Sequence, residues 1–131
     1  MNKVLVALII VLSTVLVVGG VFTYSLIAKQ KNPTTTYDPG SEFITNLNEG
    51  NSLIKAKIIL EVSNKKMVKS LEKDNHIVRD AIITVLRNKT PGEINQEDGM
   101  QELKEDIINH LNEVFETEAF VNVYFEEILV Q

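Results

Sequence analysis

The stretch LIKAKIILEV, residues 53–62, gives the clearest indication of the fold, because its side chains alternate between apolar and polar. An alternation of period two is typical of a β-strand that buries one face and exposes the other. The apolar face carries Ile54, Ala56, Ile58, Leu60 and Val62. Lys55, Lys57 and Glu61 fall on the opposite face, with Ile59 as an exception. We therefore predict a half-buried strand.

A second strand is predicted in AFVNVYFEEILVQ, residues 119–131. Its apolar side chains change sides: Val121, Val123 and Phe125 share one, and Ile128 and Val130 share the other. The change follows Glu126 and Glu127, so we predict a kink or bulge at this pair. Residues 128–131 should then form core or an edge that a neighbour can pair with. Removing the last two or three residues should damage folding or assembly.

Between these two strands the apolar spacing becomes helical. Two adjacent rows recur at every fourth residue: Ile77, Ala81 and Val85 in one, and Val78, Ile82 and Leu86 in the other. A longer helix is predicted to open at Gln96 or Asp98. Its apolar stripe consists of Met100, Leu103, Ile107, Leu111 and Val114.

The helix starts carry signals of their own. TPGE, residues 90–93, matches a capping box in which Thr90 and Glu93 exchange hydrogen bonds and the proline takes the first helical position. Asp74 or Asn75 is the predicted cap of the preceding helix.

Two weaker elements complete the pattern, a short strand within residues 41–47 and a short helix at residues 65–73. The order is then strand, strand, helices, strand. This order predicts an α+β domain with helices packed on one face of a small β-sheet.

Residues 4–28 carry no charged side chain. At ~1.5 Å per residue a helix of this length reaches roughly 37 Å, which is enough to cross a bilayer. We predict an uncleaved membrane anchor. The alternative is a cleaved signal peptide with an apolar core at residues 4–17 and the small residues Val18 and Gly20 at its cleavage site. The anchor is favoured because the apolar run continues to Ala28.

Residues 29–40, KQKNPTTTYDPG, are polar and contain two prolines, so we predict a linker there. Residues 41–131 remain for the small domain. Only Met1 to Lys3 precede the apolar run, and this short side is expected to stay in the cytoplasm while the domain lies outside.

Motifs for chemistry are missing from the sequence. The chain has no cysteine, which excludes disulfides, thiolate metal sites and a lipidated cysteine anchor. His76 reads as a solvated helix start. His110 could share a helical face with Asp106 and Glu113, but no second cluster offers further metal ligands. There is also no glycine-rich phosphate loop and no serine with an identifiable base. We predict no enzyme, no catalytic residue, no metal and no cofactor.

Charge is distributed unevenly. Residues 51–89 hold nine Lys or Arg and four Asp or Glu, whereas residues 90–131 hold one Lys and eleven Asp or Glu. Two solvated faces would explain this, and so would head-to-tail assembly in which a basic face meets the acidic face of the next copy. The candidate surface consists of Lys65, Lys66, Lys69, Lys73, Glu102, Glu105, Asp106 and Glu113. The acidic surplus argues against nucleic-acid binding.

Taken together, these parts resemble the flagellar basal-body protein family FliL. The order of anchor, polar linker and small domain is similar to that family. So are four local motifs: FITNLNEGNSLIKAKIILEV (43–62), IVRDAIITVLRNKTPGEI (77–94), GMQELKEDIINHLN (99–112) and VYFEEILVQ (123–131). Glu126 departs from the small hydroxyl residue that is common in the family before the acidic position.

The resemblance implies a single-pass protein of the bacterial cytoplasmic membrane at the flagellar basal body. Its extracytoplasmic domain would be similar to stomatin/prohibitin-type (SPFH-like) domains. It would associate with the flagellar stator membrane proteins, form a homo-oligomeric ring and support torque, swimming and swarming. The family brings no catalytic residues. From the residues alone, a membrane-anchored or secreted binding module for a small ligand or the cell wall stays open as the alternative.

Overall fold

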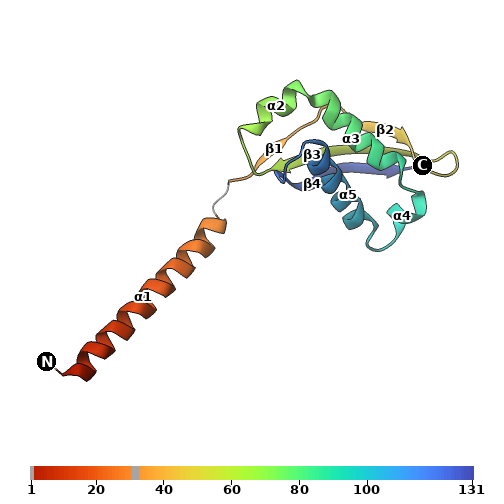
Figure 1. The fold of residues 1–131 in the computed structure, drawn as a ribbon. Coiled ribbons are helices and arrows are strands. Elements are labelled where there is room, and N and C mark those ends of the chain that lie inside the picture. Colours follow the sequence, from red (N-terminus) through yellow and green to blue (C-terminus); the bar gives the residue numbers. More distant parts are fainter. Residues whose placement is uncertain (1, 31–32) are drawn as a thin grey trace. The chain divides into compact units, whose positions relative to one another are not determined.

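The computed structural model describes residues 2–30 and 33–131, which divide between Pro33 and Thr34 into two units (Figure 1). The first unit is one helix. The second is an α+β fold whose elements follow the predicted order, preceded by one further short strand. Each unit is described by itself.

The first unit is α1, Lys3–Gln30. Its stretch Lys3–Leu26 is long and apolar enough to cross a membrane, a test that a signal sequence would also pass. Described side chains within this stretch are exposed. The hydroxyls of Ser13, Thr14 and Thr23 each donate to a backbone carbonyl three or four residues earlier. These polar groups are therefore satisfied within the helix, as an apolar medium would require.

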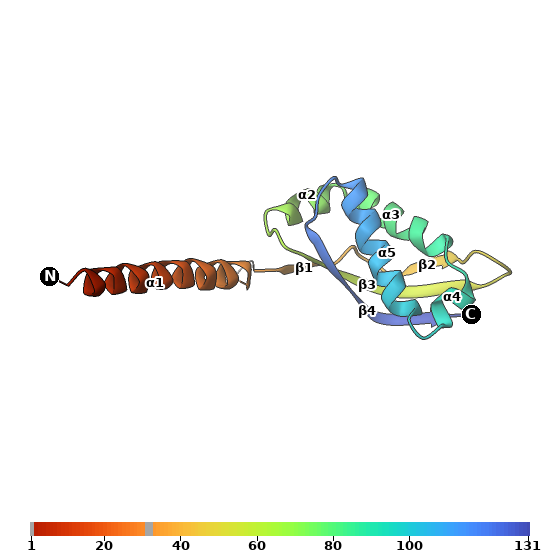
Figure 2. The same cartoon turned by 60° about the horizontal axis from the view of Figure 1, so that its bottom comes forward.

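The sheet of the second unit is built around β3, Leu53–Val62, which matches the predicted strand. β4, Phe120–Val130, pairs with β3 over nearly its whole length. β1, Thr35–Tyr37, and β2, Phe43–Asn46, pair with the two ends of β3. All three pairings are antiparallel. Since β4 occupies one edge of β3, β1 and β2 share the other edge (Figure 2).

β4 contains the predicted bulge. Lys57 lies opposite Glu127 and Ile58 opposite Phe125, so Glu126 is the extra residue. The bulge returns Ile128 and Val130 to the face that carries Phe125, and all three are half-buried against the core. The extra residue accounts for the change of sides in the sequence pattern, because it brings Ile128 and Val130 back to the face that packs on the core.

A second irregularity in β4 lies near its start. Glu61 is opposite Asn122 and Val62 is opposite Phe120, which leaves Val121 unpaired and exposed. The prediction that Val121 shares a face with Val123 is therefore wrong, and Phe120 is buried instead. At the other end, Gln131 and Leu53 exchange two backbone hydrogen bonds, of 2.8 and 2.9 Å. The truncation predicted to be harmful would remove them.

The predicted linker is wrong for residues 35–40. Residues 35–37 form β1 and pair with β3, and the Tyr37 and Pro39 side chains are buried. Polar composition suggested a linker, but one buried aromatic ring and three ladder pairs bring this segment into the fold.

The four helices cover one face of the sheet: α2 (Met67–Lys73), α3 (Asn75–Arg87), α4 (Pro91–Asn95) and α5 (Gly99–Val114). Their buried residues and the apolar face of β3 form one core. The capping box of α4 is confirmed, with Thr90 and Glu93 exchanging both bonds. Asp74 and Asp98 stand at the N-caps of α3 and α5, yet neither side chain makes a capping bond.

Gly99 lets α4 and α5 approach each other closely. A Cβ added there would lie 2.2 Å from the Glu93 carbonyl oxygen and 2.5 Å from that of Ile94. Both partners are backbone atoms, so a side chain at this position would push α4 away from the start of α5.

Candidate interaction surfaces

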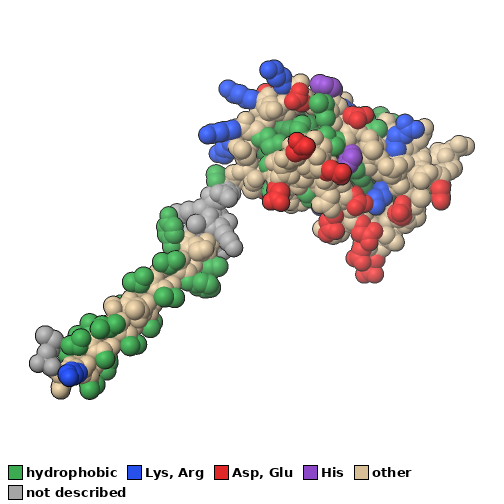
Figure 3. Space-filling model, in the orientation of Figure 1, with side chains coloured by type: hydrophobic (Ala, Val, Ile, Leu, Met, Phe, Trp, Pro, Cys, Tyr) green, Lys and Arg blue, Asp and Glu red, His purple; other side chains and the backbone are tan. Residues whose placement is uncertain are grey.

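The predicted basic residues form one group on the folded unit. Lys65 and Lys66 precede α2, and Lys69 and Lys73 lie on it; all four are exposed. None of them makes an ion pair with the described residues. Figure 3 shows basic side chains gathered at the end of the domain that carries α2.

The predicted acidic residues all lie on α5 but differ in their surroundings. Glu102, Glu105 and Glu113 are exposed. Glu102 and Glu105 accept hydrogen bonds from nearby glutamines, at 3.0 and 3.3 Å. In Figure 3 the largest acidic group lies away from the α2 end, around α4 and the start of α5. Opposite charges are thus concentrated at separate places on one small domain.

Asp106 differs from the rest of the acidic set. Its Oδ2 lies 2.5 Å from the Nζ of Lys89, which is half-buried between α3 and α4. The hydrogen bond to Asp106 raises the pKa of Lys89, and the neighbouring Glu93 and Glu102 add to this. The pair joins α5 to the segment before α4, so Asp106 already has a partner within the domain, although 47% of its side chain is exposed.

The outer face of the sheet, which the helices leave open, is a surface that sequence reasoning missed. Its charges pair with one another: Lys55 with Glu127 on β4 and with Glu42, which precedes β2, and Lys57 with Asp38, which follows β1. Tyr124 donates a 2.6 Å hydrogen bond to Glu61. Hydrogen bonds from Thr34 and Tyr124 lower the pKa of Glu61. The charged part of this face is therefore largely self-neutralised.

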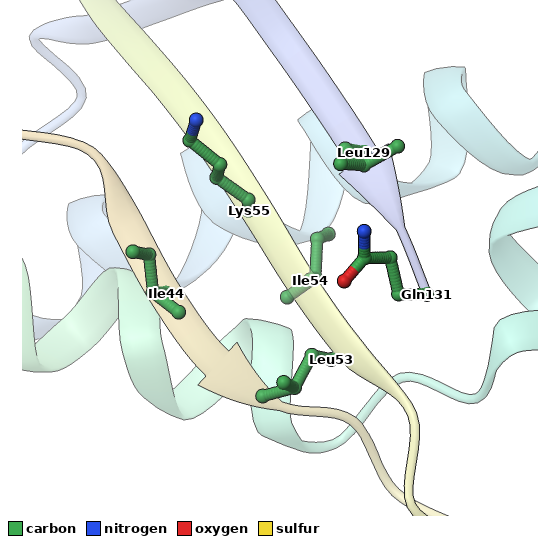
Figure 4. A pocket seen from close by; sticks show the side chains of 6 residues that line it. All are labelled: Ile44, Leu53, Ile54, Lys55, Leu129 and Gln131. Atoms are coloured by element: carbon green, nitrogen blue, oxygen red, sulfur yellow. The ribbon is translucent and has the colours of Figure 1, made fainter.

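One end of the outer face is apolar and hollowed. Ile44 on β2 is 64% exposed and Leu129 on β4 is 45% exposed. With Leu53, Ile54, Lys55 and Gln131 they line a hollow of about 310 Å³ (Figure 4). Lys55 lies between Ile44 and Leu129 across the strands. The sequence alone does not reveal this hollow, because the shared face of Ile44 and Leu129 follows only from their register with Lys55.

No catalytic arrangement appears in the described part of the chain. His76 is exposed on α3 and His110 is half-buried on α5. No three His, Cys, Asp or Glu residues within residues 2–30 and 33–131 come together as a group that could hold a metal ion.

Comparison with known proteins gives two matches. The family model for flagellar basal body-associated protein FliL matches residues 36–131, from within β1 to the end of β4. The chain is also similar to a flagellar protein FliL of Aquifex aeolicus (strain VF5), with 33% identity over 91 residues. This match covers 68% of the chain and 56% of the relative, so the chain spans a little over half of that relative's length. Because the family match takes in nearly the whole folded unit, this chain belongs to the FliL family of flagellar basal body-associated proteins.

Proposed function

We propose that this chain is a non-enzymatic component of the flagellar motor that associates with the stator units. In this proposal α1 anchors it in the cytoplasmic membrane, and the folded unit, an SPFH-like domain, lies outside the cytoplasm. The family match over residues 36–131 carries the proposal. The apolar stretch Lys3–Leu26 supports the anchor, and a folded unit whose notable features are contact surfaces supports a role in binding.

The separated charges support assembly into a ring. The exposed lysines of α2 on one copy would meet the exposed glutamates of α5 on the next. This contact is heterologous, and such contacts close into rings when the rotation between copies allows it. Charge complementarity of this kind favours the correct register and rapid association more than it adds affinity. Asp106 is left out of the contact because Lys89 already pairs with it.

A ring of these domains around a stator would act by selective binding. If the ring contacts the extended, ion-conducting stator better than the plugged one, it shifts the equilibrium toward conduction. The size of the shift is limited by the difference between the two affinities. Torque, swimming and swarming would then depend on the ring.

Deletion of the gene tests the proposal. We expect slower swimming and swarming, and fewer stators engaged per motor under load, with recovery when the full chain is supplied again. Normal motility and normal stator occupancy in the deletion strain would overturn the motor role. That result would favour the alternative of an anchored binding module for a small ligand or the cell wall.

Charge reversal tests the ring separately. Lys66→Glu with Lys69→Glu should weaken assembly of the full chain, and so should Glu102→Lys with Glu105→Lys. A mixture of the two variants should assemble again, since their charges are then complementary. Arg87→Glu changes an exposed basic residue outside the set and serves as the control. Assembly is measured by chemical crosslinking. If neither charge reversal nor salt concentration changes the extent of assembly, this interface is ruled out.

A further inference from the structure

We call residues 35–42 the strap. The first three of these residues form β1, which pairs with β3 through backbone hydrogen bonds. In β1, Thr35 lies opposite Val62 and Tyr37 opposite Leu60. The hydroxyl of Tyr37 lies 3.0 Å from the Leu71 carbonyl oxygen and 2.5 Å from the Asn75 Oδ1. Burial raises the pKa of Tyr37, whose hydroxyl is protonated at neutral pH in any case.

α3 holds the turn that follows β1 through two side chains. The Nδ2 of Asn75 donates to the Pro39 carbonyl oxygen at 3.0 Å. The guanidinium of Arg79 donates, at 2.8 to 3.3 Å, to three carbonyl oxygens: those of Pro39, Ser41 and Glu42. It also lies 4.1 Å from the ring centroid of the buried Phe43. One side chain thus holds most of the turn.

β3 holds the same turn through Lys57. Its Nζ donates to the Oδ1 of Asp38 at 2.7 Å and to the carbonyl oxygen of Gly40. The Lys57 hydrogen bond lowers the pKa of Asp38, with help from the backbone N–H of Gly40. Gly40 has a φ of 108°, a conformation that only glycine adopts without strain. The strap is therefore gripped along its whole length.

This grip places Thr35, rather than Phe43, at the start of the part of the chain that the fold holds. Residues 31–33 and the exposed Thr34 lie between Gln30, which ends α1, and Thr35, which begins β1. The five Cα–Cα steps from Gln30 to Thr35 extend at most about 17 Å. If the strap were free, the thirteen steps from Gln30 to Phe43 could extend about 44 Å.

We use tether for the chain between Gln30 and Phe43, and clamp for the contacts that hold the strap to β3 and α3. We propose that the strap is a clamped part of the tether, and that the clamp confines the domain to a short reach from the membrane surface. This inference rests on the proposed anchoring by α1 and deepens the proposed function. A partner segment would have to lie close to the membrane to meet the domain. Opening the clamp would let the domain move further from the membrane surface. The effective concentration of the domain at the partner segment would then fall, because a longer tether spreads the domain over a larger volume.

The reach can be measured on the full chain in vesicles of phosphatidylcholine and phosphatidylglycerol. The chain has no cysteine, so Ser70→Cys on the exposed side of α2 provides a single labelling site. Energy transfer from this label to acceptor-labelled lipids reports the distance of the domain from the surface. Two variants lengthen the tether in different ways. Tyr37→Phe with Arg79→Gln opens the clamp, and eight Gly/Ser residues inserted between Pro33 and Thr34 leave the clamp intact.

We expect both variants to lower the energy transfer, and the opened clamp also to speed amide hydrogen exchange in residues 35–42. Arg87→Gln, on the same helix but outside the strap contacts, should change neither readout. Unchanged transfer in the insertion variant, or in a folded opened-clamp variant whose strap exchanges rapidly, would overturn the inference. If the opened-clamp variant fails to fold by circular dichroism, amide hydrogen exchange of the unsubstituted full chain decides whether the strap is clamped. Exchange in residues 35–42 as slow as in β3 supports the clamp, and exchange as fast as in an unstructured chain overturns it.

A motility assay separates this inference from the proposed function. The insertion variant should swim as slowly as the deletion strain although its fold is intact. Full swimming with the insertion, in a strain that deletion slows, would overturn the need for a short reach while leaving the motor role standing. A chain that does not float with the vesicles would overturn the anchor and this inference together.

Discussion

The two faces of β3 come from one strand but have opposite surroundings. Every second residue from Ile54 to Val62 is completely buried under the helices. The residues between them are half-buried on the outer face, where Lys55 and Lys57 pair with the carboxylates of Glu42 and Asp38 in the strap. The buried face is uniformly apolar, whereas the outer face mixes ion pairs with exposed Ile44 and Leu129.

The difference separates stability from recognition. Burial of apolar side chains under helices supplies most of the folding free energy, at about 25 cal/mol per Å². Ion pairs on an open face add little, about 0–1 kcal/mol each. An open face with exposed apolar groups is therefore not explained by stability. Substitution of Ile44 and Leu129 tests whether a partner covers this face.

The largest expected effect is on the buried face. Leu60→Ala should lower the free energy of unfolding by about 2–5 kcal/mol, because it leaves a cavity in a packed core. The matched control is Ile59→Ala, one residue earlier on the other face, which should cost less than about 1 kcal/mol since that site can relax into solvent. Denaturant unfolding of the folded unit, residues 34–131, measures both. Equal losses at the two positions would contradict the division of β3 into two faces.

The next effect concerns the contact between helices on the covered side. Gly99→Ala should destabilise the fold by about 1–3 kcal/mol, because its methyl group would overlap backbone atoms of α4. Gly92→Ala is the matched control, since the nearest atom to its added Cβ is 3.9 Å away. That substitution should be neutral, or stabilise by up to about 1 kcal/mol. Tolerance of alanine at Gly99 would show that the two helices can separate without cost.

Period and capping signals predicted most of this fold, because they report local constraints. The alternation in residues 53–62 gave β3, and the TPGE signal gave the start of α4. The strap escaped prediction because its order comes from distant partners: Tyr37, Asn75 and Arg79 are joined only in three dimensions. The bulge at Glu126 was predicted, but its consequence for Ile128 needed the register with β3.

The candidate surfaces divide in the same way. Composition separated the basic from the acidic residues, and the structure places them in two groups. Composition could not reveal that Asp106 forms an ion pair with Lys89, nor that Ile44 and Leu129 share one face of the sheet. Those facts depend on which segments become neighbours.

Lowering the pH should reduce the free energy of unfolding by less than the substitutions at Leu60 and Gly99. Hydrogen bonds from the Thr90 backbone and hydroxyl hold the pKa of Glu93 below its ordinary value of 4.5. A carboxyl whose folded pKa is depressed contributes stability above its unfolded pKa, and this contribution is lost as the pH falls through the folded pKa. Stability should therefore decline below about pH 4.5. Glu93→Gln should flatten this part of the decline, whereas Glu97→Gln, an exposed control, should not. Identical acid profiles for the two variants would contradict a role for the capping box.

The smallest effect on stability should come with the most specific effect on function. Ile44→Ser together with Leu129→Ser removes the apolar rim of the hollow on the outer face, where Ile44 is 64% and Leu129 45% exposed. We expect a change in unfolding free energy within about 0.5 kcal/mol per site. Swimming speed and stator occupancy should fall nevertheless, because a partner that covers this face would lose its apolar contact. Asn109→Ser, an exposed substitution on α5, should alter neither readout. Normal swimming by the doubly substituted chain would mean that the open face of β3 is merely tolerated by the fold, and that recognition rests on the charged surfaces of α2 and α5.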